Sequence, residues 1–588
     1  VFATSGPGAT NLVTGLADAM IDSTPLVCIT GQVFAHLLGT DAFQETDIIN
    51  ITMPVTKWNY QVTDATEIPG ILAKAFYLAR SGRPGPVLID ITKNAQIQSF
   101  DYEGYTPCNH IRSYRPKPVI RKNFIDEAVA LINNAKKPLV IFGQGVILGK
   151  AEKEFKKFIE KSGMPAAWTI LGLSALATDH PQNVGMLGMH GNYGPNVLTN
   201  ECDVLIAVGM RFDDRVTGRL DKYAKQAKVI HLDIDPSEID KNVKAHVGVW
   251  GDCKETLPLL TLGIQEKDRS EWLKVFADYT QQEYDQCIKE ELNPSTEEMT
   301  MGEVIRIVNE TTKGNAVVVT DVGQHQMVAC RYAKFNETRS NVTSGGLGTM
   351  GFALPAAIGA KFGALDRTVI AVIGDGGIQM TIQELGTIMQ TGVDVKIMIL
   401  NNQFLGMVRQ WQQLFNDKRY SFVDIQSPDY VMVAKAYGIE GSKVEQRKDL
   451  EKRKKVYELA MEQINSINDA LEERYSIPTA YDDPNKPKST NERFAVARQR
   501  YKEPDPEDDA NPFKDQDQWE AHQVKQAQAQ FGAKNKKSEV KEYDLVYDDQ
   551  IKFIKDEIMA GDGVSSGSES ESESESEMDE EKRTKLAL

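Results

Sequence analysis

Long apolar runs, paired cysteines and an excess of basic residues are all missing from this sequence. No apolar segment is long enough to cross a bilayer as a helix. The six cysteines show no paired spacing, so we expect reduced, buried thiols in a reducing compartment rather than a disulfide framework. A formal net charge of −17 argues against a surface that mainly binds nucleic acid. The 588 residues are enough for three or four domains.

An initiator methionine and a targeting segment are also missing from the start of the sequence. Residues 1–8 instead have the character of a buried strand that runs into a tight glycine-containing loop. Because a domain rarely begins inside a core strand, we expect the chain to be truncated at this end.

The first 440 residues alternate short apolar runs with amphipathic stretches, a pattern typical of parallel sheets covered by helices. We therefore predict an α/β fold with three doubly wound domains at 1–100, 119–263 and 299–450. An aperiodic linker over 101–120 and a polar, helical surface connector over 264–298 separate them. The clearest strands are predicted at Pro25–Thr30, Pro86–Ile91, Pro138–Phe142, Asp203–Val208, Val229–Ile234, Val317–Thr320, Thr368–Ile373 and Val395–Leu400.

Residues 452–588 differ in character from the preceding sequence. A narrow apolar stripe with helical spacing runs from Val456 to Leu471, and prolines then interrupt it. The Ser/Glu run Ser565–Glu577 cannot bury apolar surface, so we expect an acidic, disordered tail that phosphorylation could charge further or that only aids solubility.

The strongest chemical signal is a pair of loops that each follow a predicted strand. Gly374-Asp375-Gly376 is followed, after 24 residues, by Asn401-Asn402. Mg²⁺ bound to a diphosphate takes few protein oxygens, which Asp375, Asn402 and the Phe404 carbonyl could supply. The glycines allow the backbone to approach the diphosphate, and a helix predicted to begin near Gln379 would direct its positive end towards it.

Further motifs accompany this pair along the first 450 residues. They are Thr4–Asn11, Gly39–Glu45, Ser81–Pro86, Arg211–Gly218, Gly323–Gln326 and Gly346–Gly351. With them, the sequence resembles the catalytic subunits of the acetohydroxyacid synthase (acetolactate synthase) family, which use thiamine diphosphate. The resemblance runs without interruption from Val1 to about Leu450.

The resemblance implies a role for each matching residue. The positions implied to contact thiamine diphosphate are Gly323, Gln324, His325, Gly374, Gly376, Gly377 and Met407. Met350 matches an apolar wedge that bends the cofactor. Gln44 and Lys93, with Phe43, match residues that reach the substrate from a partner subunit. Trp411 matches a residue that favours 2-ketobutyrate as second substrate, and Arg215 matches the cation that holds its carboxylate.

The middle domain resembles the FAD-binding domain of the same family, in which the flavin is largely structural. The matching positions are Arg83, Gly143, Gly145, Met189, His190, Arg211, Asp233, Asp235 and Asp252. The implied reaction is decarboxylation of pyruvate and condensation with a second 2-keto acid in branched-chain amino-acid biosynthesis. A homodimer is implied, a regulatory subunit is possible, and the compartment would be a bacterial cytoplasm or an organelle.

Two departures from the family pattern qualify these expectations. The family glutamate that activates the cofactor lies upstream of Val1 in the motif alignment. Because such an acid–base partner is typically worth about 10²–10⁴-fold in rate, we expect this chain alone to be almost inactive.

The second departure is the tail. From about residue 471, the sequence instead resembles the region before the helicase core of DEAH-box pre-mRNA-splicing RNA helicases. The supporting motifs are Asn491–Ala497, Asn511–Phe513, Phe531–Lys537 and Tyr547–Ile554.

The tail contains no phosphate loop or DEAH motif, so helicase activity is not implied. The two unrelated parts suggest a composite gene model. Two alternatives remain open: another flavin-containing thiamine-diphosphate enzyme, such as a pyruvate oxidase, or a non-enzymatic protein that contacts the spliceosome through its tail. We interpret Lys534–Lys537 as a solvated surface patch, with contact to RNA as the alternative.

Overall fold

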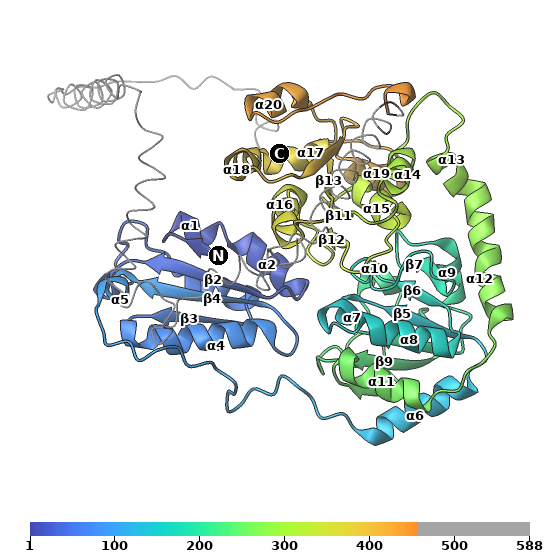
Figure 1. Cartoon of the computed structure of the whole chain (residues 1–588), viewed down its shortest axis with the longest axis horizontal. Coiled ribbons are helices and arrows are strands. Elements are labelled where there is room, and N and C mark those ends of the chain that lie inside the picture. The colour runs from blue at the N-terminus through green and yellow to red at the C-terminus, as the bar shows by residue number, and fades with distance from the viewer. Residues whose placement is uncertain (451, 453, 455–588) are drawn as a thin grey trace, which may run out of the picture. The chain divides into compact units, whose positions relative to one another are not determined.

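The computed structural model describes residues 1–450, 452 and 454. These residues belong to a compact unit spanning Val1–Asn465, and they form three sheets in which neighbouring strands run parallel (Figure 1). The predicted α/β class is therefore confirmed for this part of the chain. The apolar stripe after residue 452, the Ser/Glu run and the helicase-like segment lie outside the described residues.

The first sheet has the strand order β1-β2-β4-β3. Its strands are β1 (Phe2–Ala3), β2 (Leu26–Gln32), β3 (Trp58–Val62) and β4 (Pro86–Thr92). The helices of this region are α1 (Pro7–Thr10), α2 (Val13–Ile21), α3 (Ile48–Thr52), α4 (Ile68–Arg80) and α5 (Lys93–Ile97). The prediction that the chain opens in a buried strand is wrong, because β1 pairs only with β2 among the described residues and Phe2 is 81% exposed.

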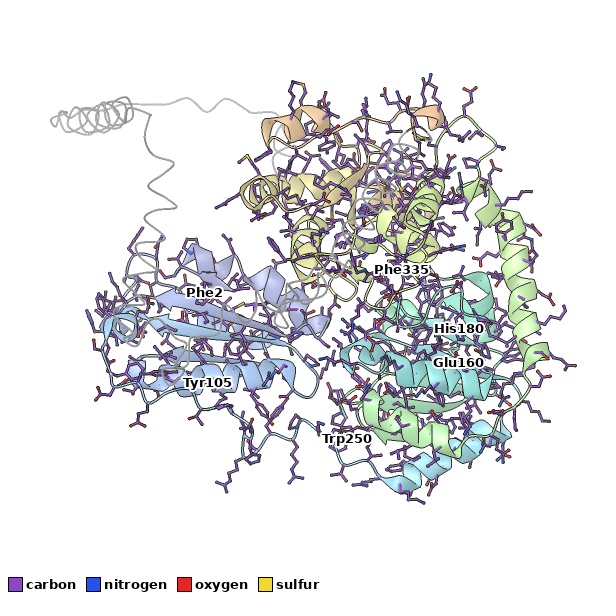
Figure 2. All side chains as sticks on the ribbon, in the orientation of Figure 1. Phe2, Tyr105, Glu160, His180, Trp250 and Phe335 are labelled. Atoms are coloured by element: carbon purple, nitrogen blue, oxygen red, sulfur yellow. The ribbon has the colours of Figure 1, made fainter. Side chains whose placement is uncertain are left out.

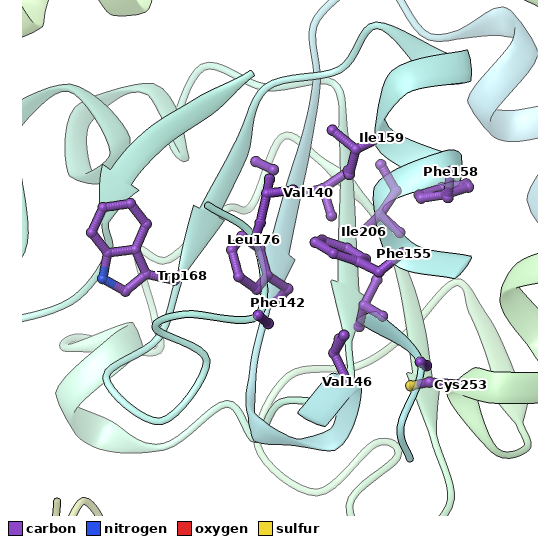
Figure 3. Close-up of a cluster of buried hydrophobic side chains, with 14 of the residues drawn as sticks. Val140, Phe142, Val146, Phe155, Phe158, Ile159, Trp168, Leu176, Ile206 and Cys253 are labelled. Atoms are coloured by element: carbon purple, nitrogen blue, oxygen red, sulfur yellow. The ribbon is translucent and has the colours of Figure 1, made fainter. Parts of the chain in front are cut away.

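The middle sheet has the strand order β10-β9-β8-β5-β6-β7. Its strands are β5 (Pro138–Phe142), β6 (Ala166–Trp168), β7 (Asn183–Met186), β8 (Val204–Val208), β9 (Lys228–Asp233) and β10 (Val247–Trp250). The helices are α6 (Lys122–Asn134), α7 (Gln144–Leu148), α8 (Glu152–Ser162), α9 (Tyr193–Leu198), α10 (Asp214–Thr217) and α11 (Cys253–Gly263). Phe142 of β5 packs on Phe155 of α8 with ring centroids 4.7 Å apart, at the centre of the core (Figure 3).

The third sheet has the strand order β12-β11-β13-β14. Its strands are β11 (Val317–Thr320), β12 (Asn341–Thr343), β13 (Val369–Gly374) and β14 (Lys396–Leu400). The helices are α14 (Met301–Thr312), α15 (Gln324–Tyr332), α16 (Ala353–Gly363), α17 (Asp375–Met380), α18 (Leu385–Thr391), α19 (Gly406–Phe415) and α20 (Tyr430–Ala436). All residues of β11 and β13 are buried, as expected for strands covered on both faces.

Three local expectations need correction. The helix after β13 begins at Asp375 rather than near Gln379, since the two glycines after Asp375 adopt helical geometry. The predicted surface connector contains α12 (Ser270–Glu283) and α13 (Lys289–Leu292), but α12 also buries Trp272 and Phe276 against the middle sheet. All six cysteines are free as expected, yet Cys287 is exposed and Cys108 is only partly buried.

Loop residues from the regions of different sheets also contact one another within the described part of the chain. The Arg83 guanidinium pairs with Asp235 at 3.1 Å and with Glu238 at 2.7 Å. The buried Phe335, which Figure 2 labels, donates its backbone N–H to the Thr178 hydroxyl at 3.0 Å. Within residues 1–450, no helix combines the length and apolar character that crossing a membrane requires.

Candidate cofactor and active site

The ends of β13 and β14 place the two predicted metal-binding loops side by side. The strands pair in parallel with Gly374 opposite Leu400, so Asp375 and Asn401 leave the sheet at the same edge. The Asp375 side chain is buried, at 1% exposure, and accepts a hydrogen bond from the Ser427 hydroxyl at 3.0 Å. A carboxylate has about four acceptor positions, so this bond leaves capacity for a cation.

The second loop folds back on itself. The Asn402 side-chain oxygen accepts from the Phe404 N–H at 3.1 Å, and Phe404 forms an isolated bridge with Asp424. The Arg409 guanidinium covers the Phe404 ring at 3.8 Å. Asn402, Phe404 and Gln324 line a cavity of about 430 Å³ next to α19. The structure therefore gathers two predicted metal ligands and one predicted diphosphate contact at one place.

The predicted diphosphate contacts lie at the start of α15. The His325 ring packs against two glycines: a Cβ added at Gly374 would lie 2.8 Å from the ring, and so would one added at Gly323. Burial lowers the pKa of His325 to about 4, so the imidazole is neutral at pH 7. Its buried Nε2 has no hydrogen-bond partner in the described part of the chain.

The glycines that follow Asp375 allow close contact on two sides. A Cβ at Gly377 would lie 2.8 Å from the Asp321 carboxylate, and one at Gly376 would lie 2.8 Å from Leu405 and 3.8 Å from the Met350 methyl. Asp321 in turn accepts backbone N–H bonds from Val322, Gly351 and Ala353.

Asp321 and Ser427 are contributors that sequence reasoning missed. Asp321 directly follows β11 and lies two residues before Gly323, a position that could have identified it. No local pattern singles out Ser427, because it contacts Asp375 from 52 residues away.

A larger cavity of about 1130 Å³ is lined by residues from the regions of all three sheets. This volume is slightly above the range of about 300–1,000 Å³ that is typical of small-molecule sites. The predicted residues that line it are Arg83, Gly145, Met189, His190, Arg211, Arg215, Asp233, Asp252, Gly323, Met407 and Trp411. Most of the predicted flavin positions, together with Arg215 and Trp411, are thus brought to one cavity.

Gly143 and Asp235 are not among the residues that line this cavity. Gly143 serves backbone packing, because a Cβ there would lie 2.6 Å from the Gly209 carbonyl oxygen. Asp235 is paired with Arg83. Burial raises the pKa of Asp233 to about 7, although Arg83 opposes this shift. Burial also lowers the pKa of His190, which is further lowered by Arg215 and Arg331.

Phe43, Gln44 and Lys93 are set apart from both cavities. Phe43 is 88% exposed, and Gln44 and Lys93 are exposed too. The Lys93 ammonium lies 5.2 Å from the centre of the Phe34 ring. Gln44 has a positive φ of 61°, and its backbone packs against Gly6, where a Cβ would lie 2.9 Å from the Gln44 carbonyl oxygen.

Residues 1–450 contain no group of three or more histidine, cysteine, aspartate or glutamate side chains able to hold a metal ion. A metal bound here would need amide or carbonyl oxygens as well as Asp375. Mg²⁺ with a phosphate-bearing ligand fits this requirement, since it is commonly held by one or two carboxylates plus phosphate oxygens.

Comparison with known proteins relates the three sheet-containing regions to thiamine pyrophosphate enzymes. Three thiamine pyrophosphate enzyme models match: the N-terminal TPP binding domain at 1–51, the central domain at 125–260 and the C-terminal TPP binding domain at 321–463. The Acetolactate synthase isozyme 2 large subunit of Escherichia coli (strain K12) is 42% identical over 451 residues, which cover 76% of this chain and 80% of that protein. The chain belongs to the acetolactate synthase family.

Two further relatives show how broad the similarity is. The Acetolactate synthase large subunit of Corynebacterium glutamicum is 45% identical over 74% of this chain and 71% of its own length. Acetolactate synthase 1, chloroplastic, of Nicotiana tabacum is 43% identical over 76% of this chain and 68% of its own length. The predicted family is therefore confirmed, and with it a thiamine-diphosphate-dependent transferase of branched-chain amino-acid biosynthesis. The helicase-like resemblance of the tail stays a prediction.

Proposed function

We propose that the ends of β13 and β14 bind thiamine diphosphate through Mg²⁺. Asp375 would give a carboxylate oxygen, Asn402 a side-chain oxygen and Phe404 its carbonyl oxygen. The observation that carries this proposal is the buried Asp375 carboxylate at the edge of the sheet, level with the Asn401–Asn402 loop. Mg²⁺ would neutralise a charge that is otherwise costly to bury.

The diphosphate itself would rest on Gly323, Gln324 and His325, with Gly374, Gly376 and Gly377 letting the backbone approach. A neutral His325 ring with an unpartnered Nε2 suits this contact, because in the tautomer that carries the proton on Nε2 it can donate a hydrogen bond to the diphosphate without adding charge. Met350 and Met407 would contact the rings of the cofactor. The methyl of Met350 lies near Gly376, which supports its place at the site.

The reaction we propose is decarboxylation of pyruvate followed by condensation with a second 2-keto acid. Thiamine diphosphate, when bound, supplies the carbanion chemistry. Arg215 would bind the carboxylate of the second acid, for which a guanidinium offers two parallel donors. Trp411 lines the same cavity and would favour 2-ketobutyrate through the additional methylene, worth about 1–3 kcal/mol in an apolar pocket.

The large cavity is the proposed FAD site. Its size and its mixed lining suit a dinucleotide, since ligand sites combine apolar walls with a few polar groups. Arg83, Arg211, Asp233 and Asp252 would make the polar contacts, Gly145, Met189 and His190 would lie along the flavin, and Gly143 would shape the backbone beneath. The flavin would be structural, as in the family.

We further propose a homodimer in which Phe43, Gln44 and Lys93 complete the site of the second copy. Their exposure, away from the two cavities described above, supports this arrangement. Relatives named as large subunits make a smaller regulatory subunit a reasonable partner. Bacterial and chloroplastic relatives favour a cytoplasmic or organellar compartment.

Thermal unfolding of the full chain tests the cofactor proposal. Thiamine diphosphate with Mg²⁺ should raise the melting temperature, because a ligand at 100 times its Kd adds about 2.7 kcal/mol of stability. Thiamine, which lacks the diphosphate, should have little effect, as should thiamine diphosphate with EDTA. Equal shifts in all three conditions would contradict metal-dependent diphosphate binding.

The near absence of turnover by these 588 residues alone stays a prediction. Acetolactate formation from pyruvate, with thiamine diphosphate, Mg²⁺ and FAD present, measures it. Rates equal to those of the Escherichia coli large subunit would show the prediction to be wrong.

A further inference from the structure

The loop before α16 contains Met350 and has little structure of its own. Residues 344–351 include glycine at positions 345, 346, 348 and 351, and Gly348 and Gly351 have positive φ angles of 74° and 83°. Glycine-rich segments lose more conformational entropy on ordering than other sequences do. Contacts from elsewhere must therefore hold this loop in one conformation.

Asp18 of α2 makes the first of these contacts. Its Oδ2 accepts hydrogen bonds from the hydroxyls of Ser344, at 2.6 Å, and Thr349, at 2.5 Å. The Ser344 hydroxyl also accepts from the N–H groups of Gly348, at 3.0 Å, and Thr349, at 2.9 Å. One carboxylate thus fixes both ends of the segment from Ser344 to Thr349.

Asp22, one turn further along at the end of α2, makes the second contact. Its Oδ2 accepts from the Gly345 N–H at 2.9 Å. A Cβ at Gly346 would lie 2.6 Å from the Asp22 Oδ1, so the loop backbone passes directly over this carboxylate. Asp18, Asp22 and Ser344 are all buried, so water does not compete for these hydrogen bonds.

The loop is held from its other end by Asp321. This carboxylate accepts from the Gly351 N–H at 3.0 Å and from the Ala353 N–H at 3.2 Å. Met350 therefore lies between two anchors, one from its own sheet and one from α2 of the first domain. Neither Asp18 nor Asp22 lines the cavities of the site.

We infer that Asp18 and Asp22 are positioning residues, through which α2 fixes the loop that presents Met350 to the cofactor. This inference rests on the proposed thiamine-diphosphate site. It assigns the first domain a role in cofactor binding within its own chain, separate from the contribution proposed for a partner copy. Loss of the Asp18 carboxylate should free the loop and weaken cofactor binding together.

The test combines hydrogen–deuterium exchange with calorimetry on the full chain. In Asp18→Ala without cofactor, the amides of residues 345–351 should exchange faster, while those of β13 should not change. With Mg²⁺ present, thiamine diphosphate should bind about tenfold more weakly or worse, as expected from losing charge-assisted hydrogen bonds. Asp18→Asn keeps one acceptor oxygen and should fall between Asp18→Ala and the unmodified chain.

Thr349→Val provides an independent variant that removes one hydroxyl and leaves α2 intact. Like Asp18→Ala, it should speed the exchange of the loop amides and weaken the binding of thiamine diphosphate. Its effect should be smaller in an Asp18→Ala background. Asp126→Ala is the matched control, because Asp126 is an exposed carboxylate on α6 that pairs with Lys122. It should leave both measurements unchanged.

The outcomes separate this inference from the proposed function. If the unmodified chain does not bind thiamine diphosphate, the proposed function fails and the cofactor role of the loop fails with it. If the unmodified chain binds thiamine diphosphate and Asp18→Ala and Thr349→Val bind it with the same affinity, the inference alone is overturned. Faster exchange of the loop without a loss of affinity would also overturn it.

Discussion

Asp22 and His325 are both buried, and burial shifts their pKa values in opposite directions. Burial raises the pKa of Asp22 from 3.8 to about 6, with Asp18 adding to the shift and Arg211 opposing it. Burial lowers the pKa of His325 to about 4. In both residues the folded protein favours the uncharged form, which is the usual response of an ionisable group to a poorly solvated position.

Asp22 gives a pH-dependent prediction at the residue scale. Between pH 3.8 and about 6, the folded state holds the Asp22 proton that the unfolded state has released, so stability falls as pH rises through this window. Asp22→Asn stays neutral and escapes this loss. The stability of Asp22→Asn relative to the unmodified chain should therefore be greater at pH 7 than at pH 4, by on the order of 2 kcal/mol. Melting temperatures of both proteins at the two pH values measure this difference. An equal difference in melting temperature between the two proteins at both pH values would contradict the prediction.

At the scale of secondary-structure elements, the strands with continuous apolar runs could be predicted from sequence. β5, β8, β11 and β13 are buried on both faces, and their boundaries agree with prediction to within one residue. β3, with the mixed sequence Trp-Asn-Tyr-Gln-Val, and the three-residue strands β6 and β12 were not predicted. Short or mixed strands are specified by their neighbours rather than by their own sequence.

The proximity of the candidate site residues could be predicted only where they follow strands closely in sequence. The Asp375 and Asn402 loops fit this description. Ser427 and Asp18 contact their partners from 52 and 326 residues away, so nothing local indicates the pairing. The start of α17 was misplaced because glycine usually disfavours helix, whereas here close packing against Asp321 and Leu405 requires it.

Two glycines in helices give opposite predictions at this scale. Gly377 of α17 has no room for a Cβ, because Asp321 would lie 2.8 Å away and is itself held by three backbone N–H groups. Gly377→Ala should destabilise the protein by about 1–3 kcal/mol. Gly359 of α16 has nothing within 4 Å of the Cβ position, so Gly359→Ala should stabilise it by about 0.5–1 kcal/mol.

Thermal and chemical denaturation of the two variants compare these effects in one protein. Gly359→Ala controls for the general effect of replacing a helical glycine. A Gly377→Ala variant as stable as Gly359→Ala would show that the close approach to Asp321 has little energetic weight.

At the scale of the whole molecule, exposed apolar side chains occur at Phe43, where a second copy is proposed to bind, and on α19. Phe43 is 88% exposed, and Val408, Leu414 and Phe415 of α19 are also exposed near Trp411. Scattered exposed apolar residues are common, but several on one short helix are typical of interaction surfaces. A monomer would leave this surface in water.

We therefore expect sedimentation equilibrium to give the mass of two chains, against 65.4 kDa for one. Phe43→Asp should shift the equilibrium towards monomer, because a charge would be buried without a partner. Tyr105→Asp, at an exposed aromatic residue of the linker, is the matched control and should remain dimeric (Figure 2). A monomer at all concentrations, with cofactor present, would contradict the proposed shared site.

Isothermal titration calorimetry of the full chain with thiamine diphosphate tests the central claim most directly. The account predicts one binding event per chain in Mg²⁺ and none detectable in EDTA. Asp375→Asn should weaken binding by about 100-fold, whereas Asp394→Asn, at an exposed carboxylate that pairs with Lys396, should not. Binding of equal affinity with and without Mg²⁺, or unaffected by Asp375→Asn, would contradict the account.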